Sequence, residues 1–209
     1  MFKKKEKKIF FDVTPDMTEY GTIVNIFQTD FKKASYEYVN INYGVMAIER
    51  AAFKDNLSLK EIIINDSVRV IEAQAFMGCN KLSRIELPKN LTEISAEMFL
   101  NCYSLDNVVL PQTVRKIGPN AFSNCSSLKN ITLPDSLRII GAEAFSGCIE
   151  LKELTLPKDV ISIGKDILLN THTEYVVLHK RFKDTVDVIF PNYEKVESLD
   201  KEMIRVHLN

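Results

Sequence analysis

Four cysteines carry the most versatile chemistry in this 209-residue chain, and they are evenly spaced: Cys79, Cys102, Cys125 and Cys148 (102 − 79 = 125 − 102 = 148 − 125 = 23). Zinc ligands come in pairs two to four residues apart, so a 23-residue spacing is not typical of a zinc site. Stacked coils would bring neighbouring thiols close, but side chains in register point the same way rather than at each other. The spacing therefore predicts four free, buried thiols.

The histidines are the next candidates for chemistry, and all three lie toward the C-terminus: His172, His179 and His207. No Ser, Cys or carboxylate accompanies them in a recognised nucleophile or metal pattern. The glycines form no phosphate-binding loop, and those after the repeated isoleucines are expected to serve turn geometry: Gly118, Gly141 and Gly164. We predict no catalytic residue, cofactor or metal, and an enzyme is the least favoured class of function.

The charge balance gives no global field for recruiting a polyanion. Lysine plus arginine number 27 and aspartate plus glutamate number 28, for a net charge of -1. Nucleic acid and anionic membrane are therefore not expected partners, and no apolar run approaches the ~18 residues of a membrane span. The lysines near the N-terminus resemble the front of an export signal, but the apolar run after them is too short, which predicts a solvated tail and a cytoplasmic protein.

The elements that must position these residues repeat every 23 residues. Phenylalanine recurs at that interval, at Phe53, Phe76, Phe99, Phe122 and Phe145. Six, nine and eleven residues after each Phe stand aliphatic residues, followed in four copies by proline. The last two aliphatic positions are two apart, which predicts one short strand per coil that ends at the proline. The other half, as in 117–122, has helical spacing and predicts a short helical or 3₁₀ return.

Residues 124–145, Asn-Cys-Ser-Ser-Leu-Lys-Asn-Ile-Thr-Leu-Pro-Asp-Ser-Leu-Arg-Ile-Ile-Gly-Ala-Glu-Ala-Phe, resemble the bacterial 23-residue, BspA-like class of leucine-rich repeats. The resemblance covers about 39–178. It implies an α/β leucine-rich-repeat solenoid with a parallel sheet, in which Asn56 and the cysteines occupy an inward position beneath a turn. Members of that family mostly act as surface-exposed interaction or adhesion proteins, so the resemblance also implies a cell-surface or secreted location.

Both open ends of a solenoid need caps, and the flanking segments differ from the repeat. We expect a tail and cap over 1–38 with a helix at 15–34, the array over 39–178 and a C-terminal cap over 179–209. Within that last cap, alternating apolar residues at 186–190 and 204–208 predict two closing strands.

Two rows of residues should point outward from the strands. The first is Glu61, Arg84, Asn107, Asn130 and Glu153; the second is Ile63, Glu86, Val109, Thr132 and Thr155, continued by Leu178. Apolar residues beside amides, hydroxyls and paired charges favour a recognition face for a macromolecule, most simply a protein. The alternative is an ordinary solvated sheet face. We therefore expect a non-catalytic binding scaffold, either a surface adhesin or host-interaction protein or an intracellular scaffold, of unknown oligomeric state.

Overall fold

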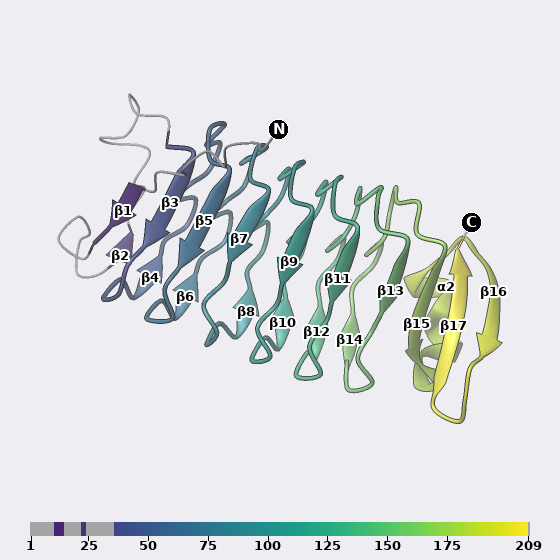
Figure 1. Cartoon of the computed structure of the whole chain (residues 1–209). Helices are drawn as coiled ribbons and strands as arrows, with labels where there is room; N and C mark the ends of the chain where they lie inside the picture. The colour runs from purple at the N-terminus through teal and green to yellow at the C-terminus, as the bar shows by residue number, and fades with distance from the viewer. Residues whose placement is uncertain (1–10, 15–21, 24–35, 209) are drawn as a thin grey trace, which may run out of the picture.

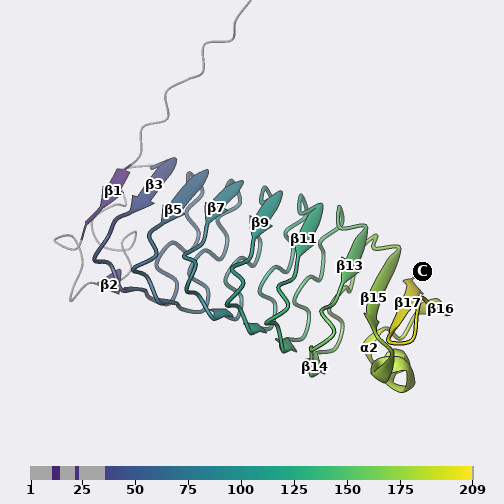
Figure 2. The ribbon, with the colours of Figure 1, turned by 60° about the horizontal axis from the view of Figure 1, so that its bottom comes forward.

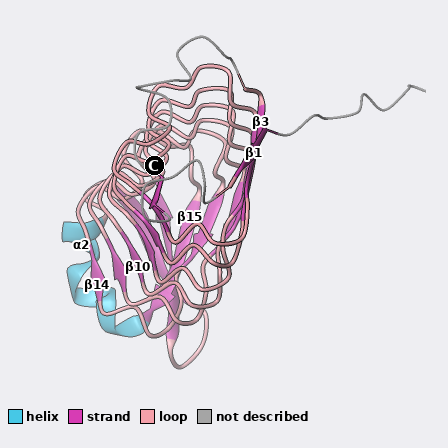
Figure 3. Cartoon of the chain, turned by 90° about the vertical axis from the view of Figure 1, so that its left-hand side faces the viewer, coloured by secondary structure: helices cyan, strands magenta, loops and turns pink. Residues whose placement is uncertain are grey.

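The computed structural model of this chain describes residues 11–14, 22–23 and 36–208. About six coils, spaced about 23 residues apart in the sequence, make up the array. They stack in chain order along one direction (Figure 1). Viewed along the array, the coils lie over one another (Figure 3). This is the solenoid with a parallel sheet that the sequence predicts.

The longer strand of each coil comes from the Leu-x-x-Ile-x-Leu segment. These strands are β3 (Tyr38–Ile41), β5 (Glu61–Ile64), β7 (Arg84–Glu86), β9 (Asn107–Val109), β11 (Asn130–Thr132) and β13 (Glu153–Thr155). Equivalent residues pair across them, for example Ile62 with Ile85 and Asn107 with Asn130. Because each position of the repeat lies beside the same position of the next coil, every strand turns the same two repeat positions outward.

Each coil also contains a second, two-residue strand that the sequence did not predict. These are β4 (Ala47–Ile48), β6 (Val70–Ile71), β8 (Glu93–Ile94), β10 (Lys116–Ile117), β12 (Ile139–Ile140) and β14 (Ser162–Ile163). They pair in parallel on the return side of the coils. The isoleucine of each is buried in the core, except Ile163, which is partly buried, so part of the apolar spacing interpreted as helical comes from a short extended segment.

The rest of the return is a series of turns rather than the expected helical or 3₁₀ segment. The N–H groups of Ser123 and Cys125 bond carbonyls three residues back, whereas Asn120 and Phe122 donate to the next coil, at 2.9 and 2.8 Å. Residues such as Asn120 (φ 53°) adopt left-handed backbone, which interrupts any helix. Bonds between coils thus replace the bonds that a helix would make within one coil.

The repeated phenylalanines form the centre of the core. All five are fully buried, and neighbouring rings stack with centroids 5.2 to 5.7 Å apart. Gly118 lies where a coil closely approaches its neighbour, because a Cβ there would meet the backbone nitrogen of Ala96 at 2.6 Å. Gly118, Gly141 and Gly164 therefore allow close stacking, which corrects the expectation that they serve turn geometry.

At the N-terminal end, β1 (Phe11–Val13) extends the long sheet beyond β3, and β2 (Thr22–Ile23) pairs with β4. The helix expected over 15–34 is therefore wrong at Thr22–Ile23, where the backbone pairs as a strand. The other residues of that segment, and the lysine-rich start of the chain, lie outside the described residues.

The C-terminal end closes with an antiparallel unit (Figure 2). Here β15 (Tyr175–His179) pairs with β13 and with β17 (Met203–Leu208), and β17 pairs with β16 (Tyr193–Ser198). The strand expected at 204–208 is confirmed. The one expected at 186–190 is wrong, because after the 3₁₀ helix η2 (Lys180–Thr185), Val186–Ile189 forms the helix α2. Val186, Ile189 and Phe190 are buried there while Val188 is exposed, which is helical spacing.

Across the described residues, no helix combines the length and apolar character that a membrane span requires.

Candidate functional site

The two predicted rows lie on one face of the long sheet. Most of their members are exposed: Arg84, Glu86, Asn107, Val109, Asn130, Thr132, Glu153 and Thr155. The residues between them, such as Ile85, Val108 and Leu154, are buried, so the strands alternate core and surface as expected. Two members differ from the expectation, since Glu61 is only 4% exposed and Ile63 is half-buried. These two contribute less to the exposed face than the sequence suggested.

Charges at the N-terminal part of this face are already paired with one another. An Arg84 guanidinium nitrogen lies 2.6 Å from a Glu86 carboxylate oxygen, and another lies 3.6 Å from Glu61. Because Glu61 is buried, its charge needs a compensating cation. Arg84 is therefore partly a structural residue that neutralises Glu61.

A hollow lies over β7 and β9, next to this charged group. Its lining includes Arg84, Glu86, Lys89, Asn107 and Val109. Val109 is 76% exposed, the second-highest exposure among the large apolar side chains of the described residues. An exposed apolar side chain beside polar ones can supply the apolar contact of an interface that has a polar rim.

The second row does not continue through Leu178, because the last coil is one residue shorter. Glu153 pairs with Tyr175 and Thr155 with Val177, which is a separation of 22 (175 − 153 = 177 − 155). A one-residue change in a strand exchanges its two faces, so Leu178 is fully buried. Tyr175 and Val177 take the outward positions instead.

The cap strands extend the same face with residues that the sequence reasoning missed. Tyr175 pairs with His207, and Val177 pairs with Arg205, which in turn pairs with Glu197. The predicted strand at 204–208 could have indicated these residues, since its inward Ile204 and Val206 leave positions 205 and 207 on the outer face. Only the pairing of β17 with β15 places these residues beside the rows.

Hydrogen bonds link the charged residues of the cap. Glu197 accepts from Lys195 at 2.8 Å and lies 2.9 Å from the His207 ring. The hydrogen bonds from Lys195 and then His207 lower the pKa of Glu197 to about 2. The Tyr175 hydroxyl donates to Glu153, which raises the pKa of Tyr175. Both carboxylates thus have partners within the chain.

The four thiols are free and buried, as predicted. Each donates a hydrogen bond to the carbonyl of the phenylalanine in the preceding coil, for example Cys102 Sγ to Phe76 O at 3.2 Å. Burial raises the pKa of Cys102 and Cys148 to about 12, and those of Cys79 and Cys125 are also raised. Asn56 takes the same position and accepts from the N–H groups of Ser58 and Leu59. These residues are structural supports and not nucleophiles.

The remaining histidine contacts described are local ones. His179 Nδ1 accepts from the Arg181 N–H, which caps η2. Within 11–14, 22–23 and 36–208, no three His, Cys, Asp or Glu residues are grouped as metal ligands.

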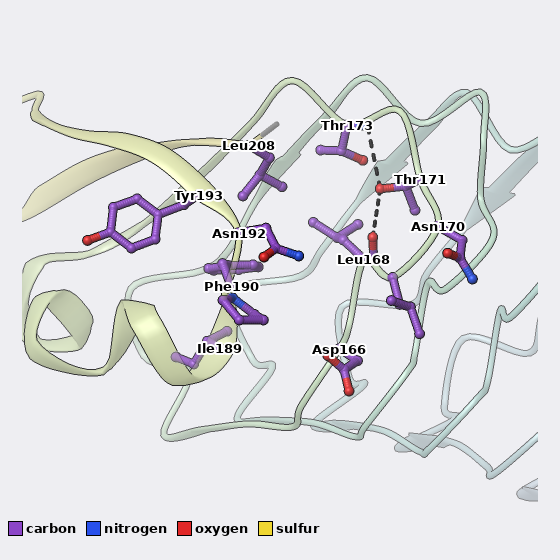
Figure 4. A pocket seen from close by; sticks show the side chains of 12 residues that line it. Asp166, Leu168, Asn170, Thr171, Thr173, Ile189, Phe190, Asn192, Tyr193 and Leu208 are labelled. Atoms are coloured by element: carbon purple, nitrogen blue, oxygen red, sulfur yellow. Dashed lines mark hydrogen bonds between the residues drawn. The ribbon is translucent and has the colours of Figure 1, made fainter.

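A cavity of about 140 Å³ lies between the last coil and the cap (Figure 4). Its walls combine Leu168, Phe190 and Leu208 with Asn170 and Asn192.

A parallel solenoid of 23-residue coils with an outward strand face defines the class of leucine-rich repeat proteins. The model of the BspA type leucine rich repeat region, in six copies, matches residues 16–129 and 115–203. The chain therefore belongs to this family. The match extends past the 39–178 range of the sequence resemblance at both ends. Among curated proteins, the comparison found no match.

Solved structures of bacterial leucine-rich repeat proteins resemble this one. The T. pallidum leucine-rich repeat protein TpLRR is 30% identical, with a TM-score of 0.59 over 73% of this chain and 83% of that protein. A leucine-rich cell surface protein from Faecalibacterium prausnitzii is 31% identical, with a TM-score of 0.56 over 70% of this chain and 42% of its own. The pneumococcal vaccine antigen PcpA is 27% identical, with a TM-score of 0.56 over 65% of this chain and 36% of that protein. This chain thus spans less than half of the latter two.

Proposed function

We propose that this protein is a non-catalytic interaction module that binds a protein ligand on the outward face of its long sheet. The observation that carries the proposal is the exposed Val109 in the hollow over β7 and β9, among paired charges and amides. A protein interface needs an apolar centre that loses its water and a polar rim around it. The face offers both.

Rigidity also supports this proposal. Each coil bonds to both of its neighbours and stacks its phenylalanine on theirs, so the outward side chains are held before any ligand arrives. A ligand then loses little free energy to ordering of the protein. The uncharged stretch Asn107, Asn130, Thr132 and Thr155 offers donors and acceptors at regular intervals along the array.

A matched pair of substitutions tests the site. Val109→Asp places a charge on the proposed face, and Val70→Asp places one on the return sheet, where Val70 is 50% exposed. Once a ligand is captured from candidate surface extracts, Val109→Asp should weaken binding at least about tenfold, which is about 1.4 kcal/mol. Val70→Asp should leave it unchanged, and both should keep the wild-type melting temperature. The reverse pattern would place the site on the return sheet.

Arg84 is better left intact in that experiment. Its removal would leave the buried Glu61 without the cation 3.6 Å away, and the loss of folding stability would obscure any effect on binding. Surface plasmon resonance with the Val109 and Val70 variants separates binding from folding more cleanly.

We further propose that the protein acts at the cell surface, as an adhesin or host-interaction protein. The similarity to a bacterial protein described as a leucine-rich cell surface protein supports this location. The four free thiols favour the second candidate, an intracellular scaffold, since disulfides are common outside the cytoplasm and thiols within it. Protease treatment of intact source cells should remove a surface protein and spare an intracellular one.

A further inference from the structure

The cap strands continue the proposed ligand face, and Arg205 occupies a central position there. In register, Arg205 lies between Val177 of β15 and Glu197 of β16. Its guanidinium carbon lies 4.6 Å from the centroid of the Tyr175 ring. Stacking on an aromatic ring fixes the plane of a guanidinium and leaves its edge free for hydrogen bonds.

The donors of Arg205 are largely unused. Its nearest carboxylate oxygen, on Glu197, is 4.0 Å away, which is beyond hydrogen-bond distance. Its Nε is buried and has no hydrogen-bond partner among the residues that the structure describes. A buried donor without a partner is costly, so such a group in a native protein calls for an explanation.

Arg84 shows the contrasting situation on the same face. Its guanidinium lies 2.6 Å from Glu86 and 3.6 Å from Glu61, so its charge is compensated within the chain. Glu197 compensates Arg205 less closely, because it lies 4.0 Å away and its oxygens contact Lys195 and His207 at 2.8 and 2.9 Å. Of these two outward arginines, Arg205 is the one whose fork of donors is presented to a ligand.

We propose that Arg205, oriented by Tyr175, is a carboxylate-binding subsite at the C-terminal end of the ligand face, and that it takes an aspartate or glutamate side chain of the protein ligand. The proposal rests on the proposed function and deepens it by naming the chemistry of the partner. A carboxylate matches a guanidinium edge with two parallel hydrogen bonds, which a single carbonyl oxygen cannot do.

Charges of both signs surround Arg205. Lys195, on the neighbouring strand β16, adds positive potential. Two of the nearby carboxylates already accept hydrogen bonds from other residues, Glu153 from Tyr175 and Glu197 from Lys195.

The test follows the Arg205 Nε–H signal by NMR in the full chain, during titration with the peptide acetyl-Ala-Glu-Ala-amide. We expect a saturable shift of Arg205, no shift of the Arg84 Nε–H, and no response to acetyl-Ala-Gln-Ala-amide. Equal shifts with both peptides, or equal shifts at both arginines, would overturn the proposal.

Variants separate orientation from charge. Tyr175→Leu removes the ring and should lower the affinity for the glutamate peptide at least about fivefold. Tyr175→Phe keeps the ring, and its affinity should stay within about twofold of wild type. If Tyr175→Leu binds as tightly as Tyr175→Phe while circular dichroism shows both folded, Tyr175 does not orient Arg205. Val109→Asp should still give the peptide response, so a failure of the carboxylate subsite is distinguishable from a failure of the main ligand face.

Discussion

At the scale of single residues, the core is a column of identical side chains. Phe122 stacks between Phe99 and Phe145, with ring centroids 5.3 and 5.5 Å away, and exposes nothing to solvent. The residue three positions later, Cys125, donates its thiol hydrogen to the Phe99 carbonyl in the preceding coil. Each repeated residue therefore stabilises its neighbours as well as its own coil.

Replacing Phe122 with alanine should destabilise the protein by about 3 to 5 kcal/mol, because it empties a buried aromatic site in the middle of the column. Lys129 is exposed, and Lys129→Ala should cost less than about 0.5 kcal/mol. Urea unfolding followed by circular dichroism measures both. Equal midpoints for the two variants would contradict the stacked core.

The buried thiols should make the folding stability decrease at alkaline pH. Burial raises the pKa of Cys102 from 9.0 to about 12, so between these values the unfolded chain loses a proton that the folded chain keeps. Stability should therefore be intact below pH 9 and fall as the pH rises toward 12. In urea unfolding at pH 7 to 10.5, Cys102→Ala should show a shallower decline than wild type, and Lys129→Ala should match wild type. Thiols that react readily in the native protein would show that the cysteines are not buried.

At the scale of elements, the same apolar alternation leads to two different structures in the cap. Residues 204–208 form a strand, while 186–190 contain a helix, although both alternate apolar and other residues. The difference lies in Ile189, which adds an apolar residue at helical spacing from Val186 and so favours a helical face. Short apolar segments are ambiguous until their neighbours are known.

A pair of substitutions distinguishes these structures in solution. Val186 is 1% exposed and Val188 is 63% exposed, whereas a strand would turn both to the same side. Val186→Asp should lower the melting temperature strongly, because it buries an unpaired charge, and Val188→Asp should change it little. Thermal unfolding by circular dichroism provides the comparison. Similar losses for both variants would favour the strand.

At the scale of the whole molecule, the array and the C-terminal cap present one outward surface. The parallel strands supply Arg84, Asn107 and Val109, and the antiparallel strands add Arg205 and His207. The shorter last coil matters here, because it sets Tyr175 rather than the next repeat position beside Glu153. The cap therefore covers the end of the core and also lengthens the candidate binding face.

The sequence alone determined the solenoid, its 23-residue period and most of the exposed rows, because a repeated core residue and a strand period of two each leave a direct trace in the order of residues. Val109 and Asn107 were placed correctly on that basis. Tertiary structure decided what depends on contacts between coils: the second strands, the turns in place of helices, the buried state of Glu61 and the role of Gly118. The same holds for Arg205, whose place beside Tyr175 follows from an antiparallel pairing of distant segments that no local pattern encodes.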